Sequence, residues 1–416
     1  MSWGRIAAAV LTVSAAFAAD PPESWVDPDT GHRVIRLTSE PDSASLYFNQ
    51  NGYTADGKGL VYTTSGGIHL LDLATRQSRR IVPAPARLIE AGRKHPRVYW
   101  IREGAVYVTE YTTGQTRKIA DLPRRGSIST VNADETLLAG TYIEGDGADY
   151  GGNRAQQART LEQPRNKGRM MEERLAARLP MAMYTVNTAT GEIRVLHRAT
   201  DWLNHLLFSP ADPALLMFCH EGPWHKVDRL WTIRTTGGAP VKIHTRTMAM
   251  EIFGHEFWSA DGKTIWYDLQ TPRGEVFWLA SYRVDTGERT WYLMQRDEWS
   301  IHFNVSRDGT LFAGDGGDPG QVARARDGRW IYLFRPELIP NRGIEDKSFV
   351  KPGILRAERL VNMSRHQYRL EPNVSFTPDQ KWVVFRSNMF GPTYVFAVEV
   401  ARPEDKGTTS QAARNP

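Results

Sequence analysis

Short runs of alternating apolar and polar residues, each closed by a turn with Asp or Gly, recur along most of this chain. The clearest spans residues 373–385, where Val-Ser-Phe and Trp-Val-Val-Phe flank a Thr-Pro-Asp turn. Such alternation is typical of half-buried strands, and a repeated strand–turn–strand unit buries its core by stacking on its neighbours. Seven units are predicted, with turns near Asp56, Pro96, Asp134, Asp212, Asp261, Asp308 and Asp379. We expect these aspartates to be turn formers only.

The two ends of the repeated region complement each other. Residues 27–38 predict a turn and a strand with no neighbour before it, and the last repeat ends at residues 394–400 without a closing strand. Pairing the two would close a ring and remove exposed sheet edges. The sequence therefore predicts an all-β fold, a seven-bladed β-propeller closed by pairing of the N-terminal strand with the last blade.

The segments outside the repeats predict the domain boundaries. Residues 1–19, with Arg5, an apolar run and a small-residue end, resemble a signal peptide; the alternative, a membrane anchor, needs about 20 apolar residues. The propeller is expected over residues 20–403. Insertions are expected at about 145–180, with a helix at 170–179, and at 316–357, a Gly-, Pro- and Arg-rich loop. Residues 404–416 are expected to be disordered. The protein is thus expected in the periplasm or outside the cell.

Charge and cysteine content narrow the possible partners. The formal net charge of +5 is spread thinly, so neither nucleic acid nor, after signal cleavage, a membrane is expected as a partner. Cys219 is the only cysteine, so no disulfide can form within the chain, and its apolar surroundings predict a buried thiol. The chain lacks the Gly-x-Ser-x-Gly turn of a peptidase propeller's hydrolase domain.

Five polar residues occupy equivalent positions in their repeats. Gln50, His255, His302 and Asn373 each stand six residues before their turn aspartate, and His205 matches if its turn has one extra residue. Equivalent positions in a propeller share a radius and a height, so these side chains should converge at one mouth. One such histidine is more often structural, but three in one register favour a binding site.

Histidines at such a mouth can bind a divalent metal or act as a base. Glu371 stands two residues before Asn373, so in a strand both point the same way and could join His302 around Mn²⁺ or Ca²⁺. Other residues predicted near the mouth as substrate-binding groups are Tyr47, Gln50, His205, His220, Arg365, His366, Tyr368 and Arg369.

Several motifs resemble those of the metal-dependent oligogalacturonate lyases. They are Asp-Pro-Asp-Thr-Gly at 27–31, Phe-Cys-His-Glu-Gly-Pro at 218–223, Val-Asp-Arg at 227–229, His-Glu-Phe-Trp at 255–258 and Ser-Phe-Thr-Pro at 375–378. The resemblance implies a propeller-type polysaccharide lyase that cleaves uronate oligosaccharides by β-elimination. It further implies that His255 is the base taking the C5 proton, that Arg229 faces the uronate and that His302 binds metal.

The chain departs from this family where the family binds its metal. Glu371 and Asn373 replace a His-x-His pair, and the family's glutamine ligand corresponds to Tyr368. Either a harder ion is held by Glu371, Asn373 and His302, or the metal is lost and an arginine neutralises the substrate carboxylate; the candidates are Arg229, Arg365 and Arg369. The alternative function is a non-catalytic periplasmic propeller that binds a glycan or a protein partner.

Overall fold

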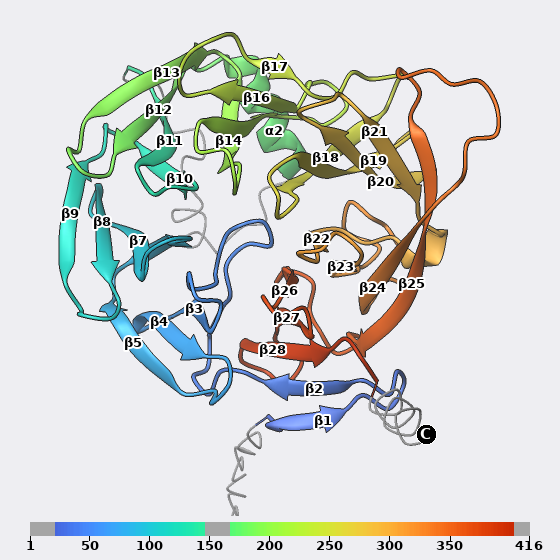
Figure 1. Ribbon diagram of the computed structural model, residues 1–416, viewed down its shortest axis with the longest axis horizontal. Coiled ribbons are helices and arrows are strands. Elements are labelled where there is room, and N and C mark those ends of the chain that lie inside the picture. The colour runs from blue at the N-terminus through green and yellow to red at the C-terminus, as the bar shows by residue number, and fades with distance from the viewer. Residues whose placement is uncertain (1–20, 146–166, 403–416) are drawn as a thin grey trace, which may run out of the picture.

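In the computed structural model, which describes residues 21–145 and 167–402, six sheets form a ring around one axis (Figure 1). One of the six has eight strands and comprises two blades, so the ring has the seven blades that the repeats predict. Blade 1 contains β3 (Gly59–Thr64), β4 (Gly67–Asp72) and β5 (Ser78–Pro83), and blade 2 contains β6 (Arg87–Ala91), β7 (Arg97–Arg102), β8 (Ala105–Glu110) and β9 (Thr116–Asp121). Blade 3 contains β10 (Ser127–Val131), β11 (Leu137–Ile143), β12 (Met181–Asn187) and β13 (Ile193–Ala199), and blade 4 contains β14 (Trp202–Phe208), β15 (Leu215–Glu221), β16 (Leu230–Arg234) and β17 (Val241–Lys242). Blade 5 contains β18 (Ile252–Trp258), β19 (Thr264–Gln270), β20 (Phe277–Arg283) and β21 (Arg289–Leu293), and blade 6 contains β22 (Asn304–Val305), β23 (Phe312–Gly314), β24 (Trp330–Leu338) and β25 (Lys351–Asn362).

Blade 7 joins both ends of the described chain. Its strands β26 (Ser375–Phe376), β27 (Trp382–Ser387) and β28 (Tyr394–Glu399) are followed outward by β2 (Arg33–Arg36), which pairs antiparallel with β28. The predicted closure of the ring is therefore confirmed. A further strand, β1 (Ser24–Val26), pairs on the outside of β2, so the N-terminal segment supplies two strands where the sequence predicted one.

The apolar core is divided between the blades. Buried apolar side chains form seven clusters, one between each pair of neighbouring blades. The seventh joins Leu60 and Tyr62 of β3 to Val395 and Ala397 of β28, so the first and last blades pack together as the others do. The space near the axis is thus left for polar residues, as stacked repeats require.

The repeat turns hold the blades' two inner strands together. In four of them a Ser or Thr hydroxyl hydrogen-bonds the aspartate two residues later, at distances of 2.5 to 2.7 Å: Thr54–Asp56, Ser259–Asp261, Ser306–Asp308 and Thr377–Asp379. The next backbone amides also donate to these carboxylates, as in Lys263 N to Asp261 at 3.0 Å. These aspartates are turn formers, as expected.

The prediction that residues 316–357 form one continuous loop is wrong. Within residues 316–357, β24 and most of β25 form a long antiparallel hairpin that supplies the outer half of blade 6. The apolar run of residues 330–334 drives this pairing, although Pro and Gly flank it. Pro352 lies in the outermost strand β25, where parallel pairing with β21 joins blade 6 to blade 5.

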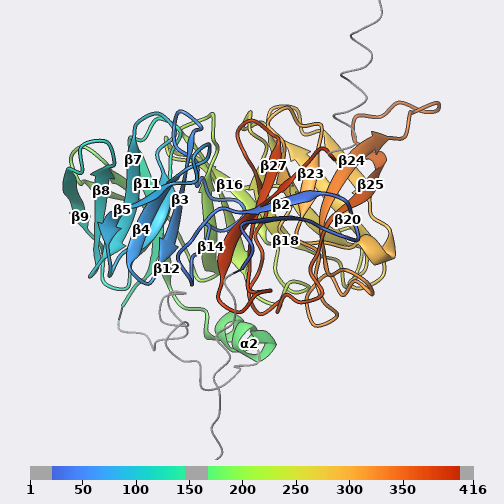
Figure 2. The ribbon, with the colours of Figure 1, turned by 90° about the horizontal axis from the view of Figure 1, so that it is seen from below.

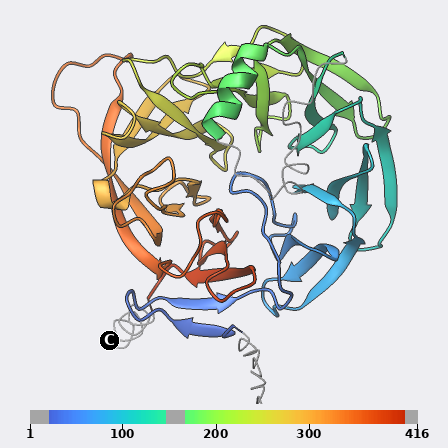
Figure 3. The same ribbon diagram turned by 180° about the vertical axis from the view of Figure 1, so that it is seen from behind.

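The first insertion contains the predicted helix, α2 (Lys167–Ala177), which begins three residues earlier than expected. It lies against one face of the ring (Figure 2, Figure 3). There Arg174 stacks over Trp202 at the start of β14, with 4.2 Å to the ring centroid, and Lys226 pairs with Glu172 at 2.9 Å. Among the described residues, the other helical element is a 3₁₀ turn, η1 (Arg296–Glu298).

Three of the predicted segments lie wholly or partly outside the described residues. The predicted signal peptide (1–19) and the predicted disordered tail (404–416) lie outside them, as do residues 146–166 of the first insertion. No helix within the described ranges is long and apolar enough to cross a membrane.

Candidate functional site

Four of the five register-matched polar residues share a strained backbone conformation. His205, His255, His302 and Asn373 all have positive φ, between 47° and 54°. Such a left-handed conformation costs a non-glycine residue about 1–3 kcal/mol and clusters at functional sites. At His205 and His255 it coincides with β-bulges in the innermost strands β14 and β18. The bulges re-aim these side chains, which simple strand alternation would not predict.

The three histidines converge as predicted. The rings of His255 and His302 lie 4.6 Å apart, edge to face. Tyr47 connects them to the third histidine, with its ring 5.3 Å from His302 and 6.4 Å from His205. Gln50 does not join them, because its side-chain amide donates to backbone carbonyls of blades 2 and 3.

Two buried aspartates that the sequence analysis missed orient two of the histidines. Asp268 Oδ2 lies 3.0 Å from His255 Nδ1, and Asp315 Oδ2 lies 2.7 Å from His302 Nδ1. Each aspartate follows its histidine by 13 residues. That repeated spacing could have revealed both aspartates. It places Asp268 in β19 opposite Gly254, and Asp315 just after β23, where its amide donates to the Ile301 carbonyl.

Burial and neighbouring charges give the two histidines different proton affinities. Burial lowers the pKa of His255 well below the usual value, and neighbouring His302 lowers it further, so His255 is neutral at neutral pH. Burial raises the pKa of Asp268 to about 7. Burial alone would lower the pKa of His302, but Asp315 and Glu371 raise it above the usual value. His255 is therefore the histidine suited to accept a proton.

Arg229 lies in a buried network. Its side chain is 2% exposed, with Nη1 2.5 Å from Glu221 and Nε 3.3 Å from Glu256, and its guanidinium lies over Trp224. Burial would raise the pKa of Glu221, but Arg229 and His205 hold it well below the usual value. The predicted contact of Arg229 with a uronate is thus replaced by contacts with two carboxylates, Glu221 and Glu256, which belong to the motifs at 218–223 and 255–258.

The Trp224 ring contacts both Arg229 of this network and His255. Its ring lies 5.2 Å from that of His255. A Cβ at Gly254 would come within 2.8 Å of Trp224 Cη2, so only glycine fits beside His255 in this packing. The glycine lets the aromatic ring approach the strand that carries the strained histidine.

Around His302, the two other predicted ligands, Glu371 and Asn373, are placed differently. His302 Nε2 is buried without a hydrogen-bond partner, and Glu371 Oε1 lies 3.8 Å from it. The side-chain oxygen of Asn373 accepts from Phe48 N at 3.3 Å, and its nitrogen donates to the Glu371 carbonyl at 3.0 Å. His302 Nε2 and the Glu371 carboxylate thus face each other, while both polar atoms of the Asn373 side chain are hydrogen-bonded to the backbone.

Within the described ranges, the remaining predicted residues form no hydrogen bond or ring contact with the three histidines. Both ring nitrogens of His366 are hydrogen-bonded, to Ser387 and to the Leu370 carbonyl. Buried Tyr368 hydrogen-bonds the Asp315 carbonyl at 3.3 Å, and Arg365 and Arg369 are exposed. His220 lies on the opposite side of β15 from Glu221, next to Trp231 and 3.8 Å from Asp201.

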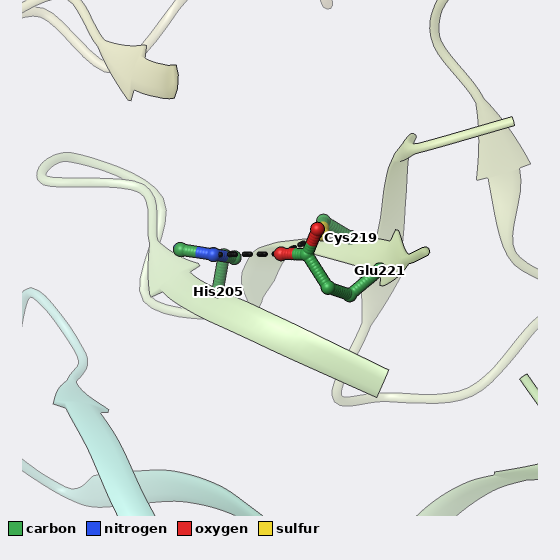
Figure 4. A group of neighbouring side chains, drawn as sticks. All are labelled: His205, Cys219 and Glu221. Atoms are coloured by element: carbon green, nitrogen blue, oxygen red, sulfur yellow. Dashed lines mark hydrogen bonds and ion pairs between the residues drawn. The ribbon is translucent and has the colours of Figure 1, made fainter. Parts of the chain in front are cut away.

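A second group of possible ligands lies at the edge of the mouth. His205, Cys219 and Glu221 have ligand atoms within 4.8 Å of one another, and His205 Nε2 lies 3.0 Å from Glu221 (Figure 4). Cys219 is buried, as predicted, and burial raises the pKa of its thiol.

Comparison with known proteins places the chain in a family. The family model for oligogalacturonate lyase matches residues 159–404, more than half of the chain. The oligogalacturonide lyase of Pectobacterium atrosepticum is 24% identical over 409 residues, covering 91% of this chain and 95% of that protein. Among solved structures, an oligogalacturonate lyase in complex with manganese has a TM-score of 0.72 at 22% identity, and one from Vibrio parahaemolyticus 0.70 at 24%; each comparison covers 91% of this chain and 96% of the other. The structural likenesses concern the fold, and together with the family match they show that this chain belongs to the oligogalacturonate lyase family.

Proposed function

We propose that this protein is an exported lyase that cleaves uronate-containing oligosaccharides by β-elimination. The observation that supports it most is the His255 imidazole, which burial keeps neutral and Asp268 orients, at the mouth where three histidines converge. Membership of the oligogalacturonate lyase family supports the substrate class. Export rests on the N-terminal sequence, and the mass of the secreted or periplasmic protein would test the cleavage.

In the proposed reaction His255 acts as the base. In the tautomer that this step requires, Nδ1–H donates to the Asp268 carboxylate and Nε2 carries the lone pair that takes the C5 proton of the uronate. The electrons of the C5–H bond form a double bond to C4, and the bond from C4 to the leaving oxygen breaks. The leaving oxygen keeps that electron pair and takes a proton from solvent. No water is consumed. Because the C5–H is only weakly acidic, the neighbouring carboxylate must be neutralised by a cation as the proton leaves.

We place a divalent ion, Mn²⁺ or Ca²⁺, at His302 Nε2 and the Glu371 carboxylate. The buried, unpartnered nitrogen and the acidic oxygen 3.8 Å away fit such an ion, and Asp315 on the other ring nitrogen is the kind of partner that orients a ligating histidine. When bound, the ion would supply the positive charge that neutralises the substrate carboxylate. Glu371 lies half-exposed in the mouth, and its carboxylate oxygen would favour a hard ion.

The proposal predicts an unsaturated product. With a panel of uronate oligosaccharides, ultraviolet absorbance from the new carbon–carbon double bond should rise for at least one substrate, and a chelator should suppress the rise. Glu371→Gln should raise the metal concentration needed for activity, because it removes the anionic ligand. Binding of the oligosaccharides without any absorbing product would contradict the proposal and favour the non-catalytic propeller.

A second prediction concerns Asp268, which acts through His255 as a positioning residue. Asp268→Asn keeps the side-chain shape but no longer fixes the Nδ1–H tautomer, so kcat should fall roughly 10²–10⁴-fold with KM nearly unchanged. The matched control is Asp315→Asn, which disturbs His302 instead and should mainly raise the metal concentration needed for activity. Equal effects of the two substitutions on kcat at saturating metal would contradict separate roles for the two pairs.

A further inference from the structure

We propose that His205, Cys219 and Glu221 form a second metal site, which takes a thiophilic divalent ion such as Zn²⁺ and is separate from the pair His302–Glu371. The three residues offer an imidazole nitrogen, a sulfur and a carboxylate oxygen, all within 4.8 Å of one another (Figure 4). A donor set that mixes sulfur and nitrogen selects ions such as Zn²⁺ over Ca²⁺ or Mg²⁺, which prefer oxygen alone.

The fold supplies the three donors from two paired strands. Cys219 and Glu221 are two residues apart in β15, so both side chains leave the same face of that strand. Asn204 of β14 pairs with Cys219, and the bulge that follows turns His205 toward the same face. The positive φ of His205 therefore directs its imidazole toward Glu221. Ligands on paired strands are held more rigidly than ligands on loops.

The distances are close to those of a loaded site. With zinc–sulfur bonds of about 2.3 Å and zinc–nitrogen bonds of about 2.0 Å, tetrahedral ligands stand roughly 3.3–3.6 Å apart. Here His205 Nε2 lies 3.0 Å and Cys219 Sγ lies 3.9 Å from Glu221 Oε2. Only small side-chain shifts are needed. The His205 side chain is 22% exposed, so the fourth position opens on the mouth, where water or a sugar oxygen can bind.

The surrounding charges also suit a divalent ion. On metal binding the Cys219 thiol releases its proton to solvent, so the thiolate and the Glu221 carboxylate supply two negative charges, and a divalent ion brings this ligand set to zero. Glu221 is also paired with Arg229 and attracted by buried Arg174, and Glu256 contacts Arg229 as well. Burying a neutral group costs far less than burying a net charge.

The two proposed sites are neighbours without a common ligand. The Tyr47 ring contacts both His205 and His302, so the sites flank one aromatic side chain at the mouth. A substitution at Glu371 therefore leaves all three ligands of the second site in place, and serves as the matched control.

The test reads metal binding rather than activity, so failure of the lyase assay would leave it unaffected. The full-length mature protein, freed of metal by a chelator, is titrated with Co²⁺. Because Cys219 is the chain's only cysteine, a thiolate-to-cobalt charge-transfer band can come from this residue alone. We expect the band in the native protein and in Glu371→Gln, and its loss in Cys219→Ser and in His205→Ala.

A variant could lose the cobalt band because it misfolds, so a second measurement uses the native protein. With one equivalent of Zn²⁺, X-ray absorption at the zinc edge should show a sulfur neighbour at about 2.3 Å. A zinc environment of nitrogen and oxygen alone, or a cobalt spectrum that Cys219→Ser leaves unchanged, would overturn the proposal. The three residues would then be a hydrogen-bonded support for Arg229.

Discussion

Replacing His255 with asparagine should lower kcat for uronate elimination about 10²–10⁴-fold, the usual contribution of a positioned base. Asparagine suits this position because it tolerates the left-handed backbone that His255 adopts, so the strand and its bulge are preserved. KM should change little, since the substrate carboxylate is neutralised elsewhere. The measurement is the initial rate of ultraviolet absorbance at saturating oligosaccharide.

The matched control for His255 is His366, a buried histidine that the sequence placed near the mouth as a substrate-binding group. Both of its ring nitrogens are hydrogen-bonded within the protein, so His366→Asn should cost stability and leave kcat near the native value. If His255→Asn turned over substrate at the native rate, or if His366→Asn lost activity while staying folded, the assignment of the base to His255 would be refuted.

Replacing Arg229 with methionine should lower the free energy of unfolding by about 3–5 kcal/mol, the usual result of removing one partner from a buried charge network. Glu221 and Glu256 would be left buried without their cation. The Arg229 charge holds the pKa of Glu221 down, so this contribution to stability is present above the pKa of an unfolded glutamate and is lost as pH falls. The difference between variant and native protein should therefore narrow in acid, as urea unfolding at several pH values would measure.

Two further arginine variants test whether the loss of stability in Arg229→Met comes from its buried charge network. Arg369 is exposed, and Arg369→Met should change the unfolding free energy by no more than about 0.5 kcal/mol. Arg229→Lys keeps the charge but loses the fork of donors, so its cost should fall between the two. A variant Arg229→Met that unfolds like the native protein but has lost activity would show instead that this arginine acts on the substrate.

The fold was predictable because each repeat carries the same signal. Alternating strands, a turn such as Thr377–Asp379, and an N-terminal strand without a partner together require a closed ring of blades. Blade 6 was harder to recognise, because its outer hairpin contains Pro336 and Pro352 and therefore reads as a loop. Such residues are tolerated there because the hairpin lies at the rim, away from the inner strands of the blade.

The site was predictable in part. Its register identified His205, His255 and His302, since equivalent repeat positions must lie at the same height. The partners of these histidines, such as Asp268, could not be found from the alternation of apolar and polar residues, because β-bulges and left-handed residues change the direction of a side chain locally. The burial of Arg229 was also hidden, because a charged residue near a motif is ordinarily assumed to face solvent or substrate.

The parallel pairing of β21 with β25 has a consequence for how the catalytic groups keep their spacing. It ties blade 5 to blade 6 at the rim, and these are the two blades whose inner ends carry His255 and His302. The angle between the two blades is therefore fixed at both ends, by packing near the axis and by backbone hydrogen bonds outside. If the ring opens transiently, it should open at another seam, and the two histidines would travel as one rigid sector.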